Sequence, residues 1–178
     1  MRLTSPILPT RSRGFSLIEV LVSMVVLAAG LLGIAGLQVS ALRWTADSGN
    51  RSTATQLADE LMEKVRSNPS QEAAYITATT QTSVPTASAA CYGAGCNAAA
   101  RVNTDIAEWR AAVAGRLPAG EAVLCRDASP TDGTERSSAA CSGAAGDPLV
   151  IKFWWRQRTS GGEVVANSAP SLVIPVRP

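Results

Sequence analysis

The sequence predicts an α+β fold, in which one long N-terminal helix is followed by a small antiparallel β-sheet. An apolar run near the N-terminus leads into a segment whose apolar residues recur at helical spacing. A second helical pattern follows in the middle of the chain. The last third of the 178 residues holds short segments of alternating large apolar residues, which are typical of strands.

Residues 15–37 form an apolar run whose only charged side chain is Glu19. At a rise of ~1.5 Å per residue, a helix of this length spans about 34 Å, enough to cross a hydrocarbon core of roughly 30 Å. The run exceeds the ~7–15 apolar residues of a secretory signal, and no small-residue cleavage site closes it before Arg43. We therefore expect a transmembrane helix.

Residues 1–14 carry Arg2, Arg11 and Arg13 but no acidic residue. Basic flanks stay on the cytoplasmic side of a membrane, so the C-terminal part of the chain is expected on the outer side. The arginines are three of 16 basic residues against 14 acidic ones, so loss of this segment would change the formal charge from +2 to −1. Neither value favours a nucleic-acid partner.

Glu19 requires an explanation because a carboxylate at the bilayer centre costs ~2.5–3.5 kcal/mol. No Lys or Arg lies within one helical turn of it. A cut after Gly14 would create a positive charge nearby, since Phe15 would then carry a free α-amino group.

The helix is expected to continue as an amphipathic half over residues 38–68, and Asn68-Pro69 supplies its end. Its apolar positions recur at helical spacing: Leu42, Ala46, Ala54, Leu57, Ala58, Leu61 and Val65. Residues 69–90 are then expected to be mostly loop, with a short helical turn over 72–77.

A second helix is predicted over residues 105–117. Asp105 and Glu108 resemble a capping box at its start, and Pro118 with Gly120 ends it. Its expected core face holds Ile106, Trp109, Val113 and Leu117.

Strands are predicted over residues 121–126, 149–158 and 172–176, with Pro175 limiting the last to a sheet edge. The second strand alternates, so that Trp155 lies on the core face with Leu149, Ile151 and Phe153. A turn at 160–162 would lead into a return strand over 163–166.

The composition excludes several classes of enzyme. The chain has no histidine, which removes Ser/His/Asp and Cys/His nucleophilic sites, zincins and most mixed-ligand zinc sites. No catalytic activity and no cofactor is expected.

The segment Gly14-Phe15-Ser16-Leu17-Ile18-Glu19 and the apolar run after it resemble the class III signal of type IV pilins and pseudopilins. The resemblance implies that a prepilin peptidase cuts between Gly14 and Phe15, that Phe15 becomes N-methylated, and that Glu19 is needed for assembly. Residues 1–14 would be the cleaved cytoplasmic leader, 15–37 the transmembrane half of the helix, 38–68 its amphipathic half and 69–178 a periplasmic head.

The head resembles that of PilV-type minor pilins. The similar features are a short-loop cysteine pair, a DIAEW helix running into LPAG, a cysteine after the next strand and the strand IKFWW. The resemblance implies a type IV pilin fold and a minor subunit that supports pilus biogenesis, twitching motility and adhesion. Its partners would be other minor pilins and the major pilin, through the N-terminal helix, and its location the inner membrane and then the pilus fibre.

Two other functions stay open. Minor pseudopilins of type II secretion share the N-terminal signal. A tip receptor for a surface ligand or for DNA is a third interpretation, and the mature charge argues against DNA.

A periplasmic head would keep its four cysteines oxidised. Three pairings are possible. We expect Cys91–Cys96 and Cys125–Cys141 because each closes a local Gly/Ser-rich loop. The alternative, a four-thiolate zinc site, is disfavoured because the spacings differ from paired C-x2-C motifs.

Trp154 lies between Lys152 and Arg156 on the non-core face of its strand. Aromatic and Arg side chains are enriched at interface hot spots, so these three residues are the candidate contact point for a partner. The favoured alternative is that Trp154 packs under a loop.

Overall fold

The computed structural model describes residues 14–158, 164–165 and 168–177. The chain divides into two compact units, one ending at Arg43 and the other beginning at Trp44, and helix α1 (Leu17–Ser67) contributes to both. Each unit is described by itself.

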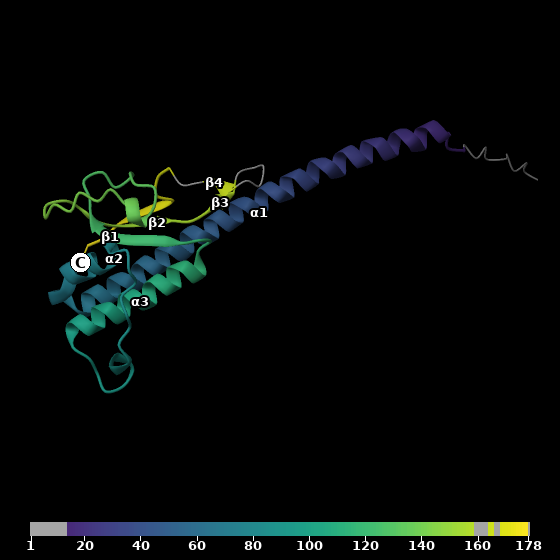
Figure 1. Cartoon of the computed structure of the whole chain (residues 1–178). Coiled ribbons are helices and arrows are strands. Elements are labelled where there is room, and N and C mark those ends of the chain that lie inside the picture. The colour runs from purple at the N-terminus through teal and green to yellow at the C-terminus, as the bar shows by residue number, and fades with distance from the viewer. Residues whose placement is uncertain (1–13, 159–163, 166–167, 178) are drawn as a thin grey trace, which may run out of the picture. The chain divides into compact units, whose positions relative to one another are not determined.

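The first unit consists of the N-terminal part of α1 (Figure 1, purple). Its large apolar side chains are exposed throughout, from Phe15 to Leu42. By length and composition α1 can cross a membrane. Its apolar surface is therefore available to lipid or to other helices.

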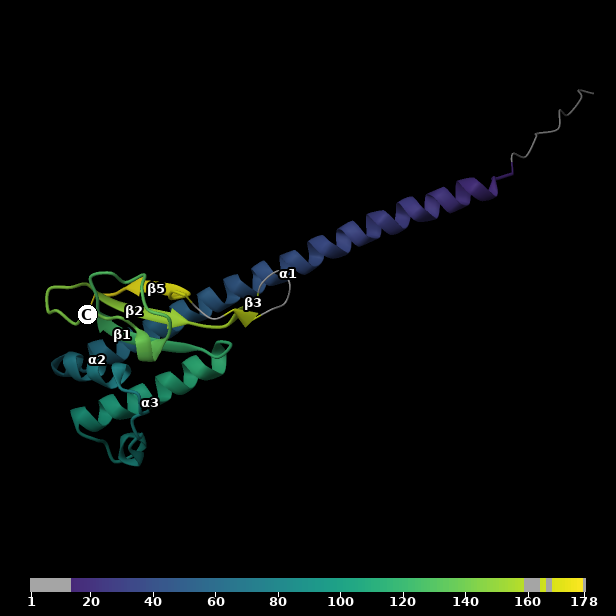
Figure 2. The same ribbon diagram turned by 45° about the horizontal axis from the view of Figure 1, so that its top comes forward.

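The second unit is the head. It contains the rest of α1, then α2 (Glu72–Thr80) and α3 (Ala98–Arg116), with single 3₁₀ turns at Pro69–Gln71, Ala89–Tyr92 and Arg136–Ser138. A three-stranded antiparallel sheet has the order β1-β2-β5 and is built from β1 (Glu121–Arg126), β2 (Leu149–Trp154) and β5 (Leu172–Pro175). The three helices pack with one face of this sheet (Figure 2). The predicted α+β class is confirmed.

The head core lies between the helices and that sheet face. Alternate residues of β2 enter it, including Ile151 and Phe153, because successive side chains of a strand point to opposite faces. Most of the predicted positions of both helices enter it as well: Ala54, Leu57, Ala58, Leu61, Val65, Ile106, Trp109, Val113 and Leu117. Two predicted positions at the start of the amphipathic half, Leu42 and Ala46, are exposed instead. The Trp109 indole also donates a hydrogen bond to the Leu57 carbonyl (2.7 Å), which ties α3 to α1.

The predicted start of the second helix is wrong. α3 begins at Ala98, where the Asn97 side chain caps it by accepting a hydrogen bond from the Ala100 backbone N–H (2.8 Å). Asp105 therefore lies in the middle of the helix, and its carboxylate is buried. The predicted turn at 72–77 is also longer, because α2 extends to Thr80.

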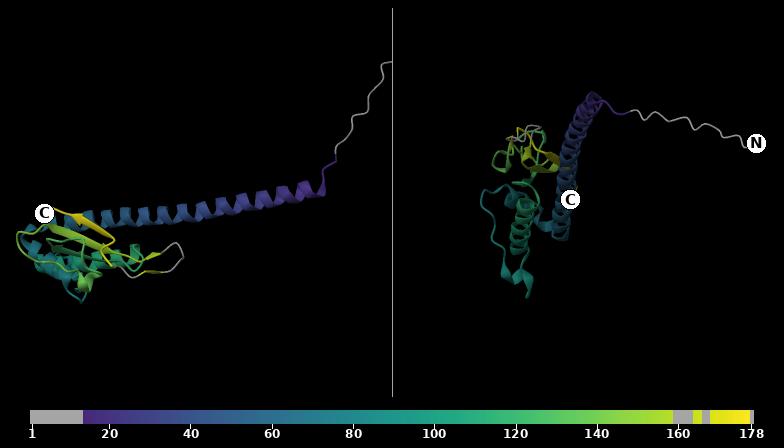
Figure 3. Two further views of the ribbon diagram at one scale, coloured as in Figure 1. Left: turned by 90° about the horizontal axis from the view of Figure 1, so that it is seen from above. Right: turned by 90° about the vertical axis from the view of Figure 1, so that its right-hand side faces the viewer.

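The predicted strand 149–158 is broken. Its first part, β2, ends at Trp154. Beyond it the backbone no longer bonds to a neighbouring strand of the three-stranded sheet, because the Arg156 N–H donates to the Pro118 carbonyl (2.8 Å). The chain then forms β3 (Gln157–Arg158), which pairs with β4 (Val164–Val165) within the predicted return strand. The predicted turn at 160–162, Glu163 and Ala166 lie outside the described residues. The left view of Figure 3 shows these two short strands beyond one end of the main sheet.

Candidate assembly site

The proposed cleavage site lies just before α1. Gly14, Phe15 and Ser16 are not helical, and the Ser16 carbonyl accepts the first helical hydrogen bonds, from the N–H groups of Glu19 (3.0 Å) and Val20 (3.3 Å). The Phe15 side chain is 82% exposed. The Gly14–Phe15 bond is thus in irregular, accessible backbone, as a protease substrate must be.

Nothing in the described structure requires glycine at position 14. A Cβ placed on Gly14 would meet no described atom within 4 Å, and Gly14 is not among the glycines with a positive φ. A packing or backbone reason for the glycine is therefore missing from the part of the chain that the structure describes. Recognition of the chain by a processing enzyme would explain the glycine without any contact inside the fold.

Glu19 lies in the first turn of α1. A carboxylate is favourable there because the helix dipole is positive at the N-terminus. The side chain lies beside Ile18, Val22 and Val26, on an exposed apolar stretch of the helix. Among the described residues, no cation forms an ion pair with its carboxylate. The arrangement offers an apolar packing surface with one negative charge near its end.

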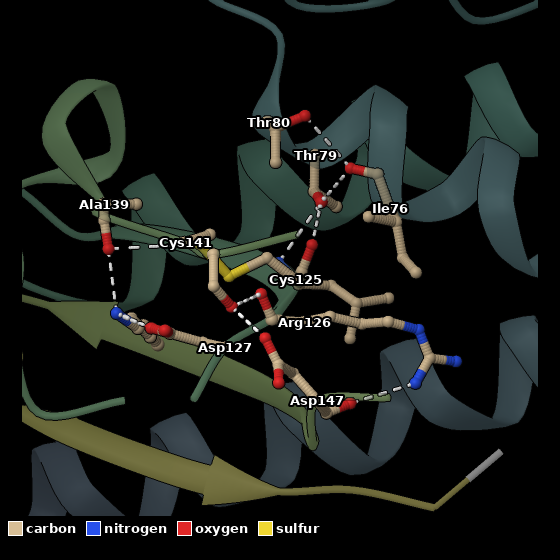
Figure 4. Close-up of a disulfide and its surroundings, with 12 residues drawn as sticks. Ile76, Thr79, Thr80, Cys125, Arg126, Asp127, Ala139, Cys141 and Asp147 are labelled. Atoms are coloured by element: carbon tan, nitrogen blue, oxygen red, sulfur yellow. Dashed lines mark hydrogen bonds and ion pairs between the residues drawn. A yellow bond between two sulfur atoms is a disulfide. The ribbon is translucent and has the colours of Figure 1, made fainter. Parts of the chain in front are cut away.

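The head contains both predicted disulfides. Cys91–Cys96 closes the short loop that precedes α3, with its Cα atoms 4.8 Å apart. Cys125–Cys141 joins β1 to the β1–β2 connection, with its Cα atoms 6.2 Å apart (Figure 4). Since all four cysteines are in these bonds, none supplies a thiolate for the alternative zinc site.

The β1–β2 connection covers the second face of the sheet. Val123, Cys125, Ala139, Val150 and Trp154 form a small apolar cluster beneath it. The Trp154 indole donates a hydrogen bond to the Gly133 carbonyl in this connection (3.1 Å). The disulfide and the indole together fix the connection to the strands.

Lys152 attaches the same connection electrostatically. Its ammonium pairs with Asp127 and with Asp132 (2.9 Å), and it donates to the Ala139 carbonyl (2.8 Å). Hydrogen bonds from Lys152 and then from Ser129 hold the pKa of Asp132 below its usual value. A fully buried ammonium is tolerated here because oxygen acceptors surround it.

These contacts correct the predicted partner-contact residues. Trp154 and Lys152 are buried under the β1–β2 connection, so neither is presented at the surface of the head. Of the three residues, only Arg156 is exposed. The alternative, packing of Trp154 under a loop, is the arrangement in the structure.

Sequence reasoning missed a polar network that joins the three helices. The Asp105 carboxylate accepts hydrogen bonds from the Tyr75 hydroxyl (2.5 Å) and from the Lys64 ammonium (3.2 Å). Lys64 also pairs with Glu108 (2.9 Å). The sequence signal was present, since Asp105 and Glu108 are three residues apart, but it indicated a cap rather than an inter-helix contact.

The network shifts the pKa values of its members. Burial lowers the pKa of Lys64, but hydrogen bonds and charges from Glu108 and Asp105 outweigh it, so the net pKa is raised. Hydrogen bonds from Lys64 and Tyr92 lower the pKa of Glu108. Desolvation, then the hydrogen bond to Asp105, raises the pKa of Tyr75. All these shifts favour the protonation states that bind the helices together.

Two family models match the chain. The model described as the prokaryotic N-terminal methylation motif covers residues 9–35, and the model described as type IV pilin Tt1218 covers residues 36–107. No curated protein and no solved structure matches. The methylation motif implies processing by a prepilin peptidase. With the long apolar helix and the small antiparallel sheet, both matches support a type IV pilin.

Proposed function

We propose that the chain is a minor pilin of the PilV type, made as a prepilin and incorporated into a type IV pilus. A prepilin peptidase would remove residues 1–14 and methylate Phe15. Residues 15–37 would hold the mature subunit in the inner membrane until it enters the fibre. The assignment to minor, PilV-type subunits rests on the resemblance of the head motifs, in particular DIAEW and IKFWW.

Assembly would bury the exposed apolar side chains of α1 against the helices of other pilins. Because these side chains would leave lipid and not water, close van der Waals packing between the helices would stabilise the contact. Three glycines of the helix have open space around them and allow the backbone of another helix to approach closely: Gly30, Gly33 and Gly36. The helix would thus supply most of the binding free energy.

One observation carries the proposal. Glu19 is the only charged residue between Phe15 and Leu42, and it lies five positions after the glycine at the proposed cut. Removal of the leader would create an α-amino group on Phe15. We propose that Glu19 of the incoming subunit neutralises this amine on a neighbouring pilin, because the pair of opposite charges can then enter an apolar environment together.

The test is complementation of a strain that lacks this gene with Glu19→Ala, with Glu19→Gln and with the wild-type chain. We expect both variants to insert into the membrane and lose their leader but to be absent from sheared fibres. Glu19→Gln is the matched control for side-chain volume, so a defect shared by both variants assigns the effect to the charge. Normal incorporation of Glu19→Ala would refute the proposed pairing.

The same strain separates the two assembly systems. A minor pilin is expected to affect surface pili and twitching motility when deleted, whereas a type II secretion pseudopilin would affect the release of secreted enzymes. Loss of secretion with normal piliation would overturn the pilus assignment and leave the processing steps in place. A defect in adhesion with normal pilus number and motility would instead favour the tip receptor.

A further inference from the structure

Trp44 differs from the other tryptophans of the chain. Its side chain is 77% exposed, whereas Trp109, Trp154 and Trp155 are at most 2% exposed. Trp44 lies two positions after Leu42, the last residue of an exposed apolar stretch of α1, with Arg43 between them. It therefore stands near the end of that stretch along the helix and is not an isolated apolar residue.

The charges of α1 limit its position in a membrane. No charged side chain lies between Glu19 and Arg43. These residues are 24 positions apart, which is about 36 Å along a helix, longer than the ~30 Å hydrocarbon core. At the average helix tilt of ~20°, their separation along the bilayer normal is still about 34 Å. Both charges can therefore lie outside the hydrocarbon at once.

The depth of the helix is then decided by its two ends. If the hydrocarbon began at Phe15, Glu19 would lie inside it, and Leu42 and Trp44 would remain in water. If Arg43 and Trp44 lie at headgroup level, the core covers the uncharged stretch and Glu19 reaches the opposite headgroups. Trp is enriched at this level, and Arg can extend its charge into it while its stem stays apolar.

We infer that Trp44, together with Arg43, binds the phospholipid headgroup region and sets the depth of α1 in the bilayer before assembly. The inference rests on the proposed function, since it takes α1 to be held in a membrane. It places the Glu19 carboxylate and the Gly14–Phe15 bond at the opposite headgroup region. There the carboxylate stays hydrated and the bond is open to a processing enzyme.

Because Trp44 is exposed and the other three tryptophans are buried, its depth in the bilayer can be measured by fluorescence quenching in the full chain. The uncleaved protein is reconstituted in vesicles of phosphatidylethanolamine and phosphatidylglycerol that contain phosphatidylcholine brominated either near the headgroup or near the acyl-chain end. We expect the Trp44 emission, obtained by subtracting the Trp44→Phe variant, to be quenched several-fold more by the shallow bromine. Equal or stronger quenching by the deep bromine, or no quenching, would overturn the inference. So would quenching that changes with protein density, which indicates contact with a second copy.

A second experiment moves the anchor along the helix. Ser40→Trp combined with Trp44→Ser shifts the aromatic residue by one turn, about 6 Å, toward Glu19. We expect this protein to be cleaved several-fold more slowly than the wild type by a prepilin peptidase in the same vesicles. Ser40→Ala, which changes the other position of the pair and keeps Trp44 in place, is expected to be cleaved normally. Unchanged cleavage of the shifted protein would contradict the role in setting depth. If no protein is cleaved, the proposed function fails, and the quenching result still decides whether Trp44 binds the headgroup region.

Discussion

The ammonium of Lys152 on β2 forms an ion pair with the carboxylate of Asp127 at the start of the β1–β2 connection, and neither side chain has solvent exposure. Both groups lost their hydration when the head folded. A buried pair of this kind stabilises less than its geometry suggests, but removal of one partner strands a charge. The attachment of the β1–β2 connection to the sheet therefore depends on both residues.

We expect Lys152→Met to lower the free energy of unfolding by roughly 3–5 kcal/mol, because Asp127 is left buried and uncompensated. Urea unfolding of the purified chain in detergent, followed by tryptophan fluorescence, measures this change. The matched control is Arg51→Met, which breaks an exposed pair with Asp47 on α1 and should cost at most about 0.5 kcal/mol. Adding Asp127→Leu to Lys152→Met should restore part of the loss; a double variant as unstable as the single one would contradict the explanation.

Two leucines of α1 offer a second comparison. Leu57 is fully buried in the head core, whereas Leu42 is 70% exposed. Leu57→Ala is expected to destabilise the head by about 2–5 kcal/mol because it leaves a cavity, and Leu42→Ala by less than about 0.5 kcal/mol. Thermal unfolding by near-ultraviolet circular dichroism reports the head alone. Similar midpoints for the two variants would show that α1 does not contribute to the head core as described.

The two disulfides are expected to contribute unequally. The Cys125–Cys141 bond closes 16 positions of chain and the Cys91–Cys96 bond five. In the loop-entropy description these correspond to about 3 and 2 kcal/mol, respectively. The first bond also joins β1 to the chain that covers Trp154, so its double serine variant should increase the accessibility of that indole to acrylamide. The Cys91→Ser/Cys96→Ser protein is the control, in which Trp154 should stay shielded.

The Lys64–Glu108 pair predicts a pH effect. The pKa of Glu108 is lower in the folded chain than in the unfolded one, so the unfolded state takes up a proton first as the pH falls. Its contribution to stability is therefore complete above the unfolded pKa of about 4.3 and is lost as the pH falls through the lower folded value. Thermal midpoints measured from neutral pH to below pH 4 should fall less steeply in Glu108→Gln. The same dependence of the midpoint on pH in the wild type and in Glu108→Gln would contradict a contribution of this pair to stability.

Gly14→Val tests the processing step separately from assembly. The substitution meets no described atom in the fold, so we expect normal insertion and a normal head but retention of the 14-residue leader. Intact mass spectrometry of the membrane fraction distinguishes the two forms. Gly49→Val, on another glycine with open space around it, is the control and should be processed. Full processing of Gly14→Val would contradict the role given to Gly14.

The elements whose pattern is local were predictable from the sequence. β1 matches the predicted residues, and α1 ends at Ser67, just before the Asn68-Pro69 stop. The cysteine pairs were predictable because each closes a nearby loop. The predictions that failed concern contacts between residues far apart in the sequence. Asp105 resembled a helix cap, but its carboxylate accepts hydrogen bonds from Tyr75 and Lys64, which lie on other helices.

The predicted partner contact of Lys152 and Trp154 was wrong for the same reason. Their strand face was correct, but what covers a face depends on where a connection of more than 20 residues folds back. The sequence contained Asp127 and Asp132 without any sign that Lys152 would pair with both. The residues of the cleavage motif could be identified from the sequence, because their proposed role depends on short spacing along the chain and not on a tertiary contact.

α1 also limits how the head can be isolated. Six core residues come from this helix, all between Ala54 and Val65, and the sheet face that they cover is apolar. A fragment that starts at Pro69 would expose that face to water, and we expect it to aggregate. A fragment that starts at Trp44 keeps every one of these residues while omitting the apolar stretch that ends at Leu42. The shortest soluble head therefore has its N-terminal boundary inside a helix, not in a loop.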